Sequence, residues 1–368
     1  CQPRESMAPP KRTQVAVIGG GLTGLSIASG LRDQGATTHL FEKRNNLASG
    51  MAIRGLGLAS RILLDPPHRL VQGLGLNTAK EVFDFSSEGV ESWGDSLNPT
   101  GIAYASKGET EAKEVELNLA ALQQLGVPGV PLVADEKTGF GPGWVMPKDG
   151  CLNQTAIVDQ LTSHLNFSTQ MEAIQIDDDG ADLAVRFANG HTTRADMVIM
   201  TGGAQLTSWT QDKFHPVRHQ AIATAPVDRC ISRPMHIQYG YTSVRQLDSG
   251  EVLLSGCRWA TPHMEVGETN DETINVNIDE KLKGFLHQHW SHLTGTPITH
   301  QWTGIMTFSC DGLPIIGPLP GRPRIIVCGG FGAYSPSLTL RAARAVIDGI
   351  TTGDSPGVPS CFRTLRFS

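Results

Sequence analysis

The sequence lacks a long apolar run, a large charge excess of either sign, and any repeated or low-complexity tract. No stretch approaches the roughly 18 consecutive apolar residues of a transmembrane helix, so no membrane span is expected. The 30 basic and 36 acidic side chains leave a formal net charge of -6. This mild acidity argues against nucleic acid, or an anionic membrane surface, as a binding partner.

The sequence also lacks cysteines at redox or metal-binding spacing. Its seven cysteines are odd in number and contain no C-x-x-C pair, which favours reduced thiols in a reducing compartment. Residues 1–12 are polar and lack the apolar segment of a secretory signal. On a helix, His287 and His289 would point in nearly opposite directions, so no metal site is expected there. These features predict a cytoplasmic protein without a bound metal.

The most informative stretch that is present spans residues 14–44. A short apolar run at 15–18 predicts a buried parallel strand, and it ends at GGGLTG, residues 19–24, a G-x-G-x-x-G motif. A helical pattern follows the motif. A second apolar run at 38–41 then predicts another strand, with Glu42 at its carboxyl end. Strand, glycine loop, helix and acid in this order predict a dinucleotide site.

Each part of this pattern has a physical role. Gly19 allows a tight turn out of the strand, Gly21 allows the backbone to approach a diphosphate, and Gly24 allows close helix–strand packing. The free N–H groups and partial positive charge of the helix N-terminus favour an anion. The carboxylate of Glu42 can accept the ribose hydroxyls of an adenosine and would repel a 2′-phosphate. The motif alone leaves open which dinucleotide binds.

The rest of the chain points to two domains, because 368 residues exceed the usual size of one. An apolar run at 197–200 predicts a strand that resumes the dinucleotide fold after a long insertion. Residues 237–245 and 251–258 predict two paired strands joined by a turn at 248–250. Near the C-terminus, a buried strand at 324–328 precedes a glycine-rich loop and a helix.

Several segments, in one order along the chain, resemble the D-amino-acid-oxidase-type family of FAD-dependent oxidoreductases, which includes glycine oxidase and monomeric sarcosine oxidase. Residues 19–44 fit the FAD motif of this family, and 49–57 (SGMAIRGLG) resembles its S-G-x-S-x-R-x-x-G segment. Residues 302–319 (WTGIMTFSCDGLPIIGPL) are similar to its W-x-G-x-R-P-x-T-P-D-G-L-P-I-I-G signature. Residues 200–204 and 329–337 (GGFGAYSPS) resemble a strand end and a loop that contact the flavin.

This resemblance implies an α/β fold with a Rossmann-like FAD-binding domain. That domain would be interleaved with a substrate domain built on a mixed, largely antiparallel sheet with helices. The FAD-binding domain would comprise residues 11–60, 150–215 and 305–355. The substrate domain would comprise residues 61–149 and 216–304.

The resemblance also implies how FAD is held. A cysteine that attaches FAD covalently in some members would fall at Gly304, so noncovalent FAD is expected, with attachment through Cys310 as the alternative. An oxygen-activating lysine would fall near Leu254, and its absence leaves O2 or another electron acceptor open. The residues expected to bind FAD are Gly19, Gly21, Leu22, Thr23, Gly24, Glu42, Lys43, Ser49, Gly50, Met171, Thr201, Gly202, Gly203, Gly330, Phe331, Gly332, Ala333, Tyr334 and Ser335.

On the substrate side, the sequence departs from the family pattern. Met306 stands where members that use amino acids carry an arginine, which binds the substrate carboxylate. Three arginines offer a carboxylate partner from elsewhere, namely Arg54, Arg245 and Arg258. Arg54 is favoured because its segment should touch flavin or substrate. A surface position is the alternative for each of them.

Two further side chains are candidates for the substrate site. Tyr241 is expected on a strand of the substrate domain, where it would set the polarity of the pocket. His219 can take a proton from a substrate amine, although a hydrogen-bonded structural histidine is the alternative reading. Both candidates rest on the resemblance.

The activity implied is oxidation of a C–N bond in an amine or amino-acid-like small molecule, by hydride transfer to flavin N5, giving an imine. One alternative is a 2-hydroxy acid or alcohol dehydrogenase on the same fold, with a base such as His219 near the hydroxyl. Another is a flavin-binding partner subunit without catalysis of its own. Met306 and Leu254 would suit such a subunit, because they replace the arginine and the lysine that active members of the family use.

Overall fold

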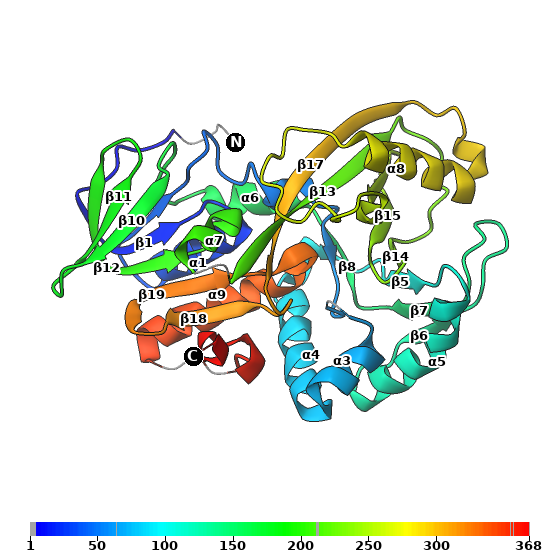
Figure 1. Ribbon diagram of the computed structural model, residues 1–368, viewed down its shortest axis with the longest axis horizontal. Coiled ribbons are helices and arrows are strands. Elements are labelled where there is room, and N and C mark those ends of the chain that lie inside the picture. The colour runs from blue at the N-terminus through cyan, green and yellow to red at the C-terminus, as the bar shows by residue number, and fades with distance from the viewer. Residues whose placement is uncertain (1–4, 64, 211–212, 354, 356, 368) are drawn as a thin grey trace. The chain divides into compact units, whose positions relative to one another are not determined.

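The structure is a computed structural model that describes residues 5–63, 65–210, 213–353, 355 and 357–367. The chain divides into two compact units, each assembled from segments that are distant in the sequence (Figure 1). The first unit comprises Cys1–Ile53, Asn153–His215 and Thr307–Ser368. The second unit comprises Arg54–Leu152 and Pro216–Met306.

The first unit is built on an eight-stranded sheet with a parallel centre. The parallel strands follow the order β9 (Phe167–Ser168), β2 (Thr38–Phe41), β1 (Arg12–Ile18), β12 (Thr192–Met200) and β19 (Arg322–Gly329). Three antiparallel strands extend it, namely β10 (Ala173–Asp178), β11 (Leu183–Phe187) and β18 (Ile315–Leu319). The expected strands at 15–18, 38–41 and 197–200 are therefore confirmed.

Helices α1 (Leu22–Asp33) and α9 (Ser335–Thr352) pack against each other in this unit. Their contact is close, because a Cβ added at Gly30 would lie 2.4 Å from Cδ1 of Ile347. Shorter helices complete the unit: α2 (Met51–Arg54), which ends in the second unit, α6 (Gln154–Thr162), α7 (Leu206–Trp209), and the 3-10 turns η2 (Gly203–Gln205), η5 (Gly332–Tyr334), η6 (Ser360–Phe362) and η7 (Thr364–Phe367).

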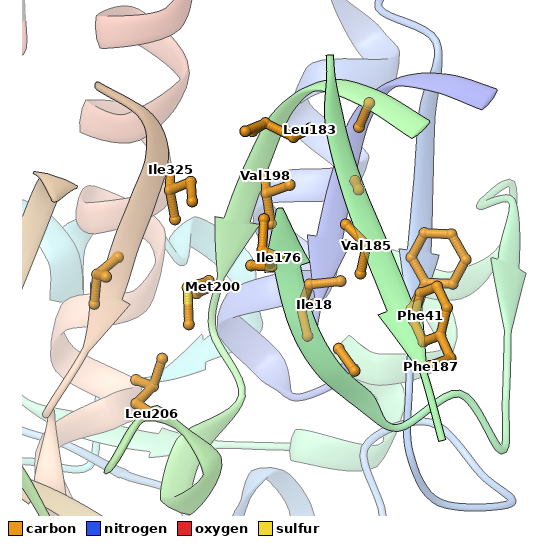
Figure 2. Packing of buried hydrophobic residues seen from close by; sticks show 14 of the residues in the cluster. Ile18, Phe41, Ile176, Leu183, Val185, Phe187, Val198, Met200, Leu206 and Ile325 are labelled. Carbon is orange, nitrogen blue, oxygen red and sulfur yellow. The ribbon is translucent and has the colours of Figure 1, made fainter. Parts of the chain in front are cut away.

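The core of the first unit follows from alternation along its strands. Ala16 and Ile18 on β1 join a buried cluster with side chains from β10, β11 and β12 (Figure 2). Val15 and Val17 point to the other face of the sheet and are also buried. A strand that is buried on both faces explains why residues 15–18 are apolar without a polar position.

The second unit contains another eight-stranded sheet, which is largely antiparallel and includes the parallel pair β14–β5. Its order is β17 (Ile298–Ser309), β13 (Phe214–Thr224), β16 (Val252–Gly256), β15 (Thr242–Gln246), β14 (Met235–Ile237), β5 (Ile102–Ala105), β7 (Gly143–Met146) and β6 (Val130–Leu132). A three-stranded sheet has the order β3 (Leu58–Ala59), β8 (Gly150–Leu152) and β4 (Leu97–Asn98).

One face of the large sheet packs on helix α8 (Val276–His289), in a cluster that includes Ile222, Val244 and Leu254 from the strands. The opposite face carries Tyr104 and Leu253, which pack with Leu58 of the three-stranded sheet. The remaining helices of this unit are α3 (Pro67–Leu74), α4 (Leu76–Glu91), α5 (Glu109–Gln124), η1 (Gly94–Ser96), η3 (Arg258–Ala260) and η4 (Ser291–Leu293).

The expected pairing of two strands across residues 248–250 is confirmed by β15 and β16, but the N-terminal half of the first expected strand is wrong. Residues 237–245 do not form a continuous strand, because β14 ends at Ile237 and β15 begins at Thr242. Gln238 and Tyr239 between them both have φ of 56°. Left-handed backbone at two successive residues cannot continue a strand, so Tyr241 lies in a turn.

Candidate functional site

The glycine loop after β1 is shaped by two close backbone contacts. Gly19 has a φ of 110°, and a Cβ added there would lie 2.8 Å from Cα of Gly202. A Cβ at Gly24 would lie only 1.9 Å from the carbonyl oxygen of Gly19. At Gly21, by contrast, no atom of the described residues would come within 4 Å of a Cβ. The loop is therefore tightly packed at both ends and open at its middle.

Helix α1 begins at this open position of the loop. Its N-cap residue is Gly21, which offers no side chain to cap the first N–H groups. These N–H groups carry partial positive charge and suit an anion such as a diphosphate.

A chain of hydroxyl groups joins this helix start to that of α9. Oγ1 of Thr23 lies 3.4 Å from Oγ1 of Thr339, which lies 3.1 Å from Oγ of Ser335. The first turns of the two helices therefore lie close together. Sequence reasoning identified Thr23 and Ser335 but missed Thr339, for which the sequence offers no local signal.

The acid at the end of β2 is oriented by backbone donors. Glu42 is buried, and its Oε2 accepts a hydrogen bond from the N–H of Gly20 at 2.7 Å. Its Oε1 accepts one from the N–H of Arg44 at 2.8 Å. Each carboxylate oxygen retains capacity for a further donor such as a ribose hydroxyl. Met171 is adjacent, because its N–H donates to the carbonyl of Glu42 at 2.8 Å, whereas Lys43 is exposed.

Two other expected segments contact the glycine loop. The N–H of Ala48 donates to the carbonyl of Gly20 at 2.8 Å, which holds the segment containing Ser49 and Gly50 against the loop. Oγ1 of Thr201 lies 3.0 Å from the carbonyl oxygen of Ile18, so the end of β12 is fixed there as well. Gly202 and Gly203 follow Thr201 directly.

The loop before α9 is packed against two phenylalanines. A Cβ at Gly330 would lie 2.9 Å from Cε1 of Phe214, and one at Gly332 would lie 2.3 Å from Cε1 of Phe308. Phe331 is buried and forms an isolated antiparallel bridge with Phe308. Ala333 and Tyr334 belong to the 3-10 turn that leads into Ser335 and α9. Packing fixes the backbone of this loop.

These residues of the first unit fit an adenine dinucleotide. The open position at Gly21 leaves room for a diphosphate beside the helix N–H groups, and the carboxylate of Glu42 has acceptor capacity for a ribose. The loop, the acid and the two helix starts therefore form a candidate cofactor site. FAD is the dinucleotide that the sequence resemblance implies.

Several candidate substrate residues of the second unit are already engaged there. Nη1 of Arg54 donates to the carbonyls of Asp271 at 3.0 Å and Thr303 at 2.8 Å, and forms an ion pair with Oδ2 of Asp271 at 3.0 Å. Nη1 of Arg245 donates to the carbonyl of Leu56 at 2.6 Å, and Nη1 of Arg258 donates to that of Met264 at 3.1 Å. Sequence reasoning missed Asp271, which lies more than 200 positions from its partner.

The other candidates differ widely in exposure. Met306 is buried at 2% exposure, whereas Tyr241 is 43% exposed, with Cζ of Arg258 5.9 Å from its ring centroid. Nδ1 of His219 is buried and has no hydrogen-bond partner within the described part of the chain. Burial, together with the charge of Arg258, lowers the pKa of His219 to about 3. His219 is therefore a neutral imidazole near pH 7.

A second histidine in this unit was not anticipated. Nδ1 of His236 on β14 lies 2.8 Å from Oγ of Ser243 on β15. The His236 ring centroid lies 5.2 Å from that of Tyr104 on β5, which stacks in turn on Trp144 of β7 at 5.2 Å. Burial lowers the pKa of His236 to about 4. The sequence signal was weak, because β14 has only three residues.

Neither a metal cluster nor a membrane helix is present among the residues that the structure describes. No three His, Cys, Asp or Glu side chains there are grouped so that they could hold a metal ion. None of the helices in that part of the chain is both long enough and apolar enough to cross a membrane.

Comparison with known proteins agrees with the sequence resemblance. The model of a protein family described as FAD dependent oxidoreductase (DAO) matches residues 14–348. A search of curated protein sequences finds no match. Solved structures share the fold, so the expected α/β class, with its Rossmann-like domain and mixed sheet, is confirmed.

Three of these structures illustrate the likeness. Glycine oxidase from Geobacillus kaustophilus is 16% identical with a TM-score of 0.78, covering 96% of this chain and 99% of that one. L-proline dehydrogenase from P. horikoshii is 18% identical with a TM-score of 0.78, covering 98% of each. Fructosyl amine:oxygen oxidoreductase from Aspergillus fumigatus is 15% identical with a TM-score of 0.79, covering 98% and 91%.

Proposed function

This chain belongs to the DAO family of FAD-dependent oxidoreductases, and from that membership we propose that it oxidises a C–N bond of an amine or amino-acid-like small molecule to an imine. The family match over residues 14–348 carries the proposal. The solved structures that share the fold support the substrate class, because they are named for glycine, L-proline and fructosyl amine, each of which contains a C–N bond.

Bound FAD would supply the acceptor for the hydride that leaves the substrate carbon. The N–H groups at the start of α1, beside Gly21, would hold its diphosphate, and the carboxylate of Glu42 would hold the ribose. The partial positive charge of the α9 N-terminus, which follows residues 330–335, would favour negative charge on a cofactor bound beside it. Noncovalent binding is proposed because Gly304 offers no thiol at the position where some members attach FAD, with Cys310 as the alternative point of attachment.

On the substrate side, Arg54, His219, Tyr241 and Met306 are proposed to contact the substrate or set its orientation. An arginine at position 306 would give a substrate carboxylate a charge-assisted hydrogen bond of about 1.5–3 kcal/mol, and Met306 cannot form this bond. A simple α-amino acid is therefore disfavoured relative to an amine whose carboxylate is absent or bound elsewhere. O2 or another electron acceptor completes the turnover.

Anaerobic titration of the purified yellow protein tests this function. The panel contains amines with a carboxylate (glycine, sarcosine, L-proline, iminodiacetate), amines without one (pyrrolidine, N-methylbenzylamine) and 2-hydroxy acids (glycolate, lactate). We expect at least one amine, and no hydroxy acid, to bleach the visible flavin absorbance. Bleaching by a hydroxy acid alone would instead identify an alcohol dehydrogenase. Stable FAD that no compound reduces would favour a partner subunit without catalysis.

The mode of FAD attachment is tested separately. Precipitation of the holoprotein with acid should release all flavin into the supernatant. A yellow pellet that turns colourless in a Cys310→Ser variant would show a covalent bond through Cys310. The exposed position of this thiol makes the variant a mild one.

A further inference from the structure

We propose that His236 is a substrate-contacting residue whose Nε2 accepts a hydrogen bond from the N–H of a neutral amine, with Ser243 as its positioning residue. This inference rests on the proposed amine oxidation and names the form of the substrate. It concerns side chains of the second unit that the resemblance does not assign to any role.

The His236 ring is held on two sides. In the sheet register, His236 stands opposite Ser243 on β15 and opposite Tyr104 on β5. Ser243 bonds to Nδ1 at 2.8 Å, and the Tyr104 ring packs beside the imidazole with an interplanar angle of 38°. A ring fixed by a hydroxyl and an aromatic neighbour has a defined orientation before any ligand arrives.

The other ring nitrogen of His236 remains available. Nε2 forms no hydrogen bond to any residue that the structure describes. It does not belong to the buried polar atoms without a partner, so it is accessible from outside the protein. The side chain is only half-buried. When Nδ1–H donates to Oγ of Ser243, the lone pair on Nε2 points away from the serine as an acceptor.

The surrounding face of the sheet favours a neutral amine over an ammonium ion. Arg245 follows Ser243 by two residues on β15, so it projects from the same face. Arg245 forms no ion pair with an acidic side chain within the described residues. Because His236 itself is neutral, the positive charge of Arg245 on this face is not offset by the histidine and disfavours a cation. A neutral amine is also the form that can lose hydride from its α-carbon.

His289, in the same unit, is a structural histidine, and its ring nitrogens differ from those of His236 in accessibility. His289 is 5% exposed, its Nδ1 lies 2.7 Å from the carbonyl oxygen of Thr138, and its Nε2 is buried. Its ring packs at 4.4 Å from that of Phe140. His289 is enclosed by core aromatics, whereas His236 keeps one nitrogen accessible. His289→Phe is therefore the matched control.

His236 should favour amines that carry an N–H in the neutral form over tertiary amines, because a neutral tertiary amine has no N–H to donate to Nε2. Sarcosine and its tertiary analogue N,N-dimethylglycine differ in this respect, and the same pairing applies to any amine that reduces the wild-type flavin. His236→Phe keeps a ring beside Tyr104 and removes the acceptor. For the amine with an N–H, this variant should lower the ratio of the flavin-reduction rate constant to the dissociation constant about tenfold (about 1.4 kcal/mol). The change for the tertiary amine should be less than about twofold.

The experiment is anaerobic stopped-flow reduction of the FAD-loaded protein by both amines, with dissociation constants taken from the perturbed flavin spectrum. Ser243→Ala, a milder change, should shift the selectivity in the same direction by about threefold. His289→Phe should alter both amines equally. Equal effects of His236→Phe and Ser243→Ala on the two amines would overturn the inference while leaving the proposed function intact. If no amine reduces the wild-type flavin, the proposed function and this inference both fail.

Discussion

At the scale of single residues, Gly21 and Gly24 stand three positions apart and have opposite surroundings. A side chain at Gly24 would overlap the carbonyl oxygen of Gly19 and approach Oγ1 of Thr201 to 2.7 Å. We expect Gly24→Ala to lower the free energy of unfolding by about 2 kcal/mol or more, measured by urea denaturation of the apoprotein. Gly284→Ala in α8, where a Cβ meets no described atom within 4 Å, should instead stabilise by about 0.5–1 kcal/mol.

Gly21→Ser should separate folding from cofactor binding. Serine is a good N-cap, and the backbone of Gly21 has φ of -76°, which any residue can adopt. Stability of the apoprotein should therefore stay equal or rise. The same side chain occupies the open space and the N–H groups proposed for the diphosphate, so the dissociation constant for FAD should rise at least about tenfold. Unchanged FAD affinity in a fluorescence titration would contradict the site.

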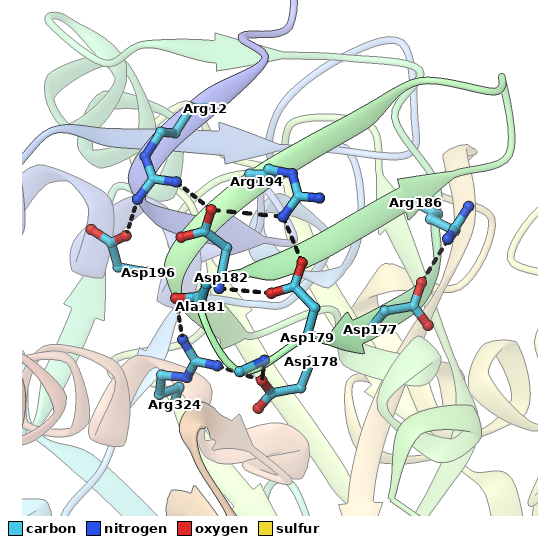
Figure 3. A network of polar contacts seen from close by, with 11 residues as sticks. Arg12, Asp177, Asp178, Asp179, Ala181, Asp182, Arg186, Arg194, Asp196 and Arg324 are labelled. Carbon is cyan, nitrogen blue, oxygen red and sulfur yellow. Dashed lines mark hydrogen bonds and ion pairs between the residues drawn. The ribbon is translucent and has the colours of Figure 1, made fainter.

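At the scale of elements, ion pairs in the two units differ in their surroundings. In the first unit, Asp178, Asp179 and Asp182 around the β10–β11 turn pair with arginines from other strands (Figure 3). The side chain of Arg194 is 50% exposed there, so Arg194→Ala should lower the free energy of unfolding only slightly. Urea denaturation in high salt should reduce even this difference, because salt screens exposed charges.

The pair Arg218–Glu265 in the second unit is buried, with side-chain exposures of 8% and 6%. Glu265 also accepts a hydrogen bond from Nδ2 of Asn275, the N-cap of α8, at 2.8 Å. Glu265→Ala would remove the buried partner of Arg218, leave it only the exposed carboxylate of Glu268 at 3.5 Å, and loosen the start of this helix. We expect a loss of about 3–5 kcal/mol, measured in parallel with Arg194→Ala. Equal effects of the two variants would refute this distinction.

At the scale of the whole molecule, buried histidines link stability to pH. Burial lowers the pKa of His39 from 6.5 to about 4, and His236 behaves in the same way. The unfolded chain binds these protons more readily, so stability present above pH 6.5 is lost as pH falls toward 4. Asp149 acts in the opposite direction, because burial raises its pKa to about 7.

A substitution at His39 isolates one of these contributions. His39→Gln keeps a hydrogen-bonding group near Ser168, which lies 2.8 Å from Nε2, and does not titrate. The difference in unfolding free energy between pH 7 and pH 5 should become smaller than in the wild type. An identical pH dependence of the two proteins in urea titrations would show that His39 does not contribute.

Local patterns in the sequence predicted the parts of the fold that depend on neighbours along the chain. The strand at 15–18, the helix that starts at Leu22 and the strand before Glu42 follow from periodicity and glycine placement within one short stretch. The strand expected at 237–245 forms only from Thr242 onward, because Gln238 and Tyr239 adopt a left-handed backbone that neither residue type demands. Tyr241 consequently lies in a turn.

The sequence by itself determined the glycine loop, the acid after β2 and the family, because these depend on steric demands that only certain residue types meet at fixed spacing. Only the tertiary structure decided that Arg54 pairs with Asp271 and that Ser243 orients His236. Such pairs join segments whose approach is set by strand register and sheet order, and no local pattern encodes which polar side chains then meet.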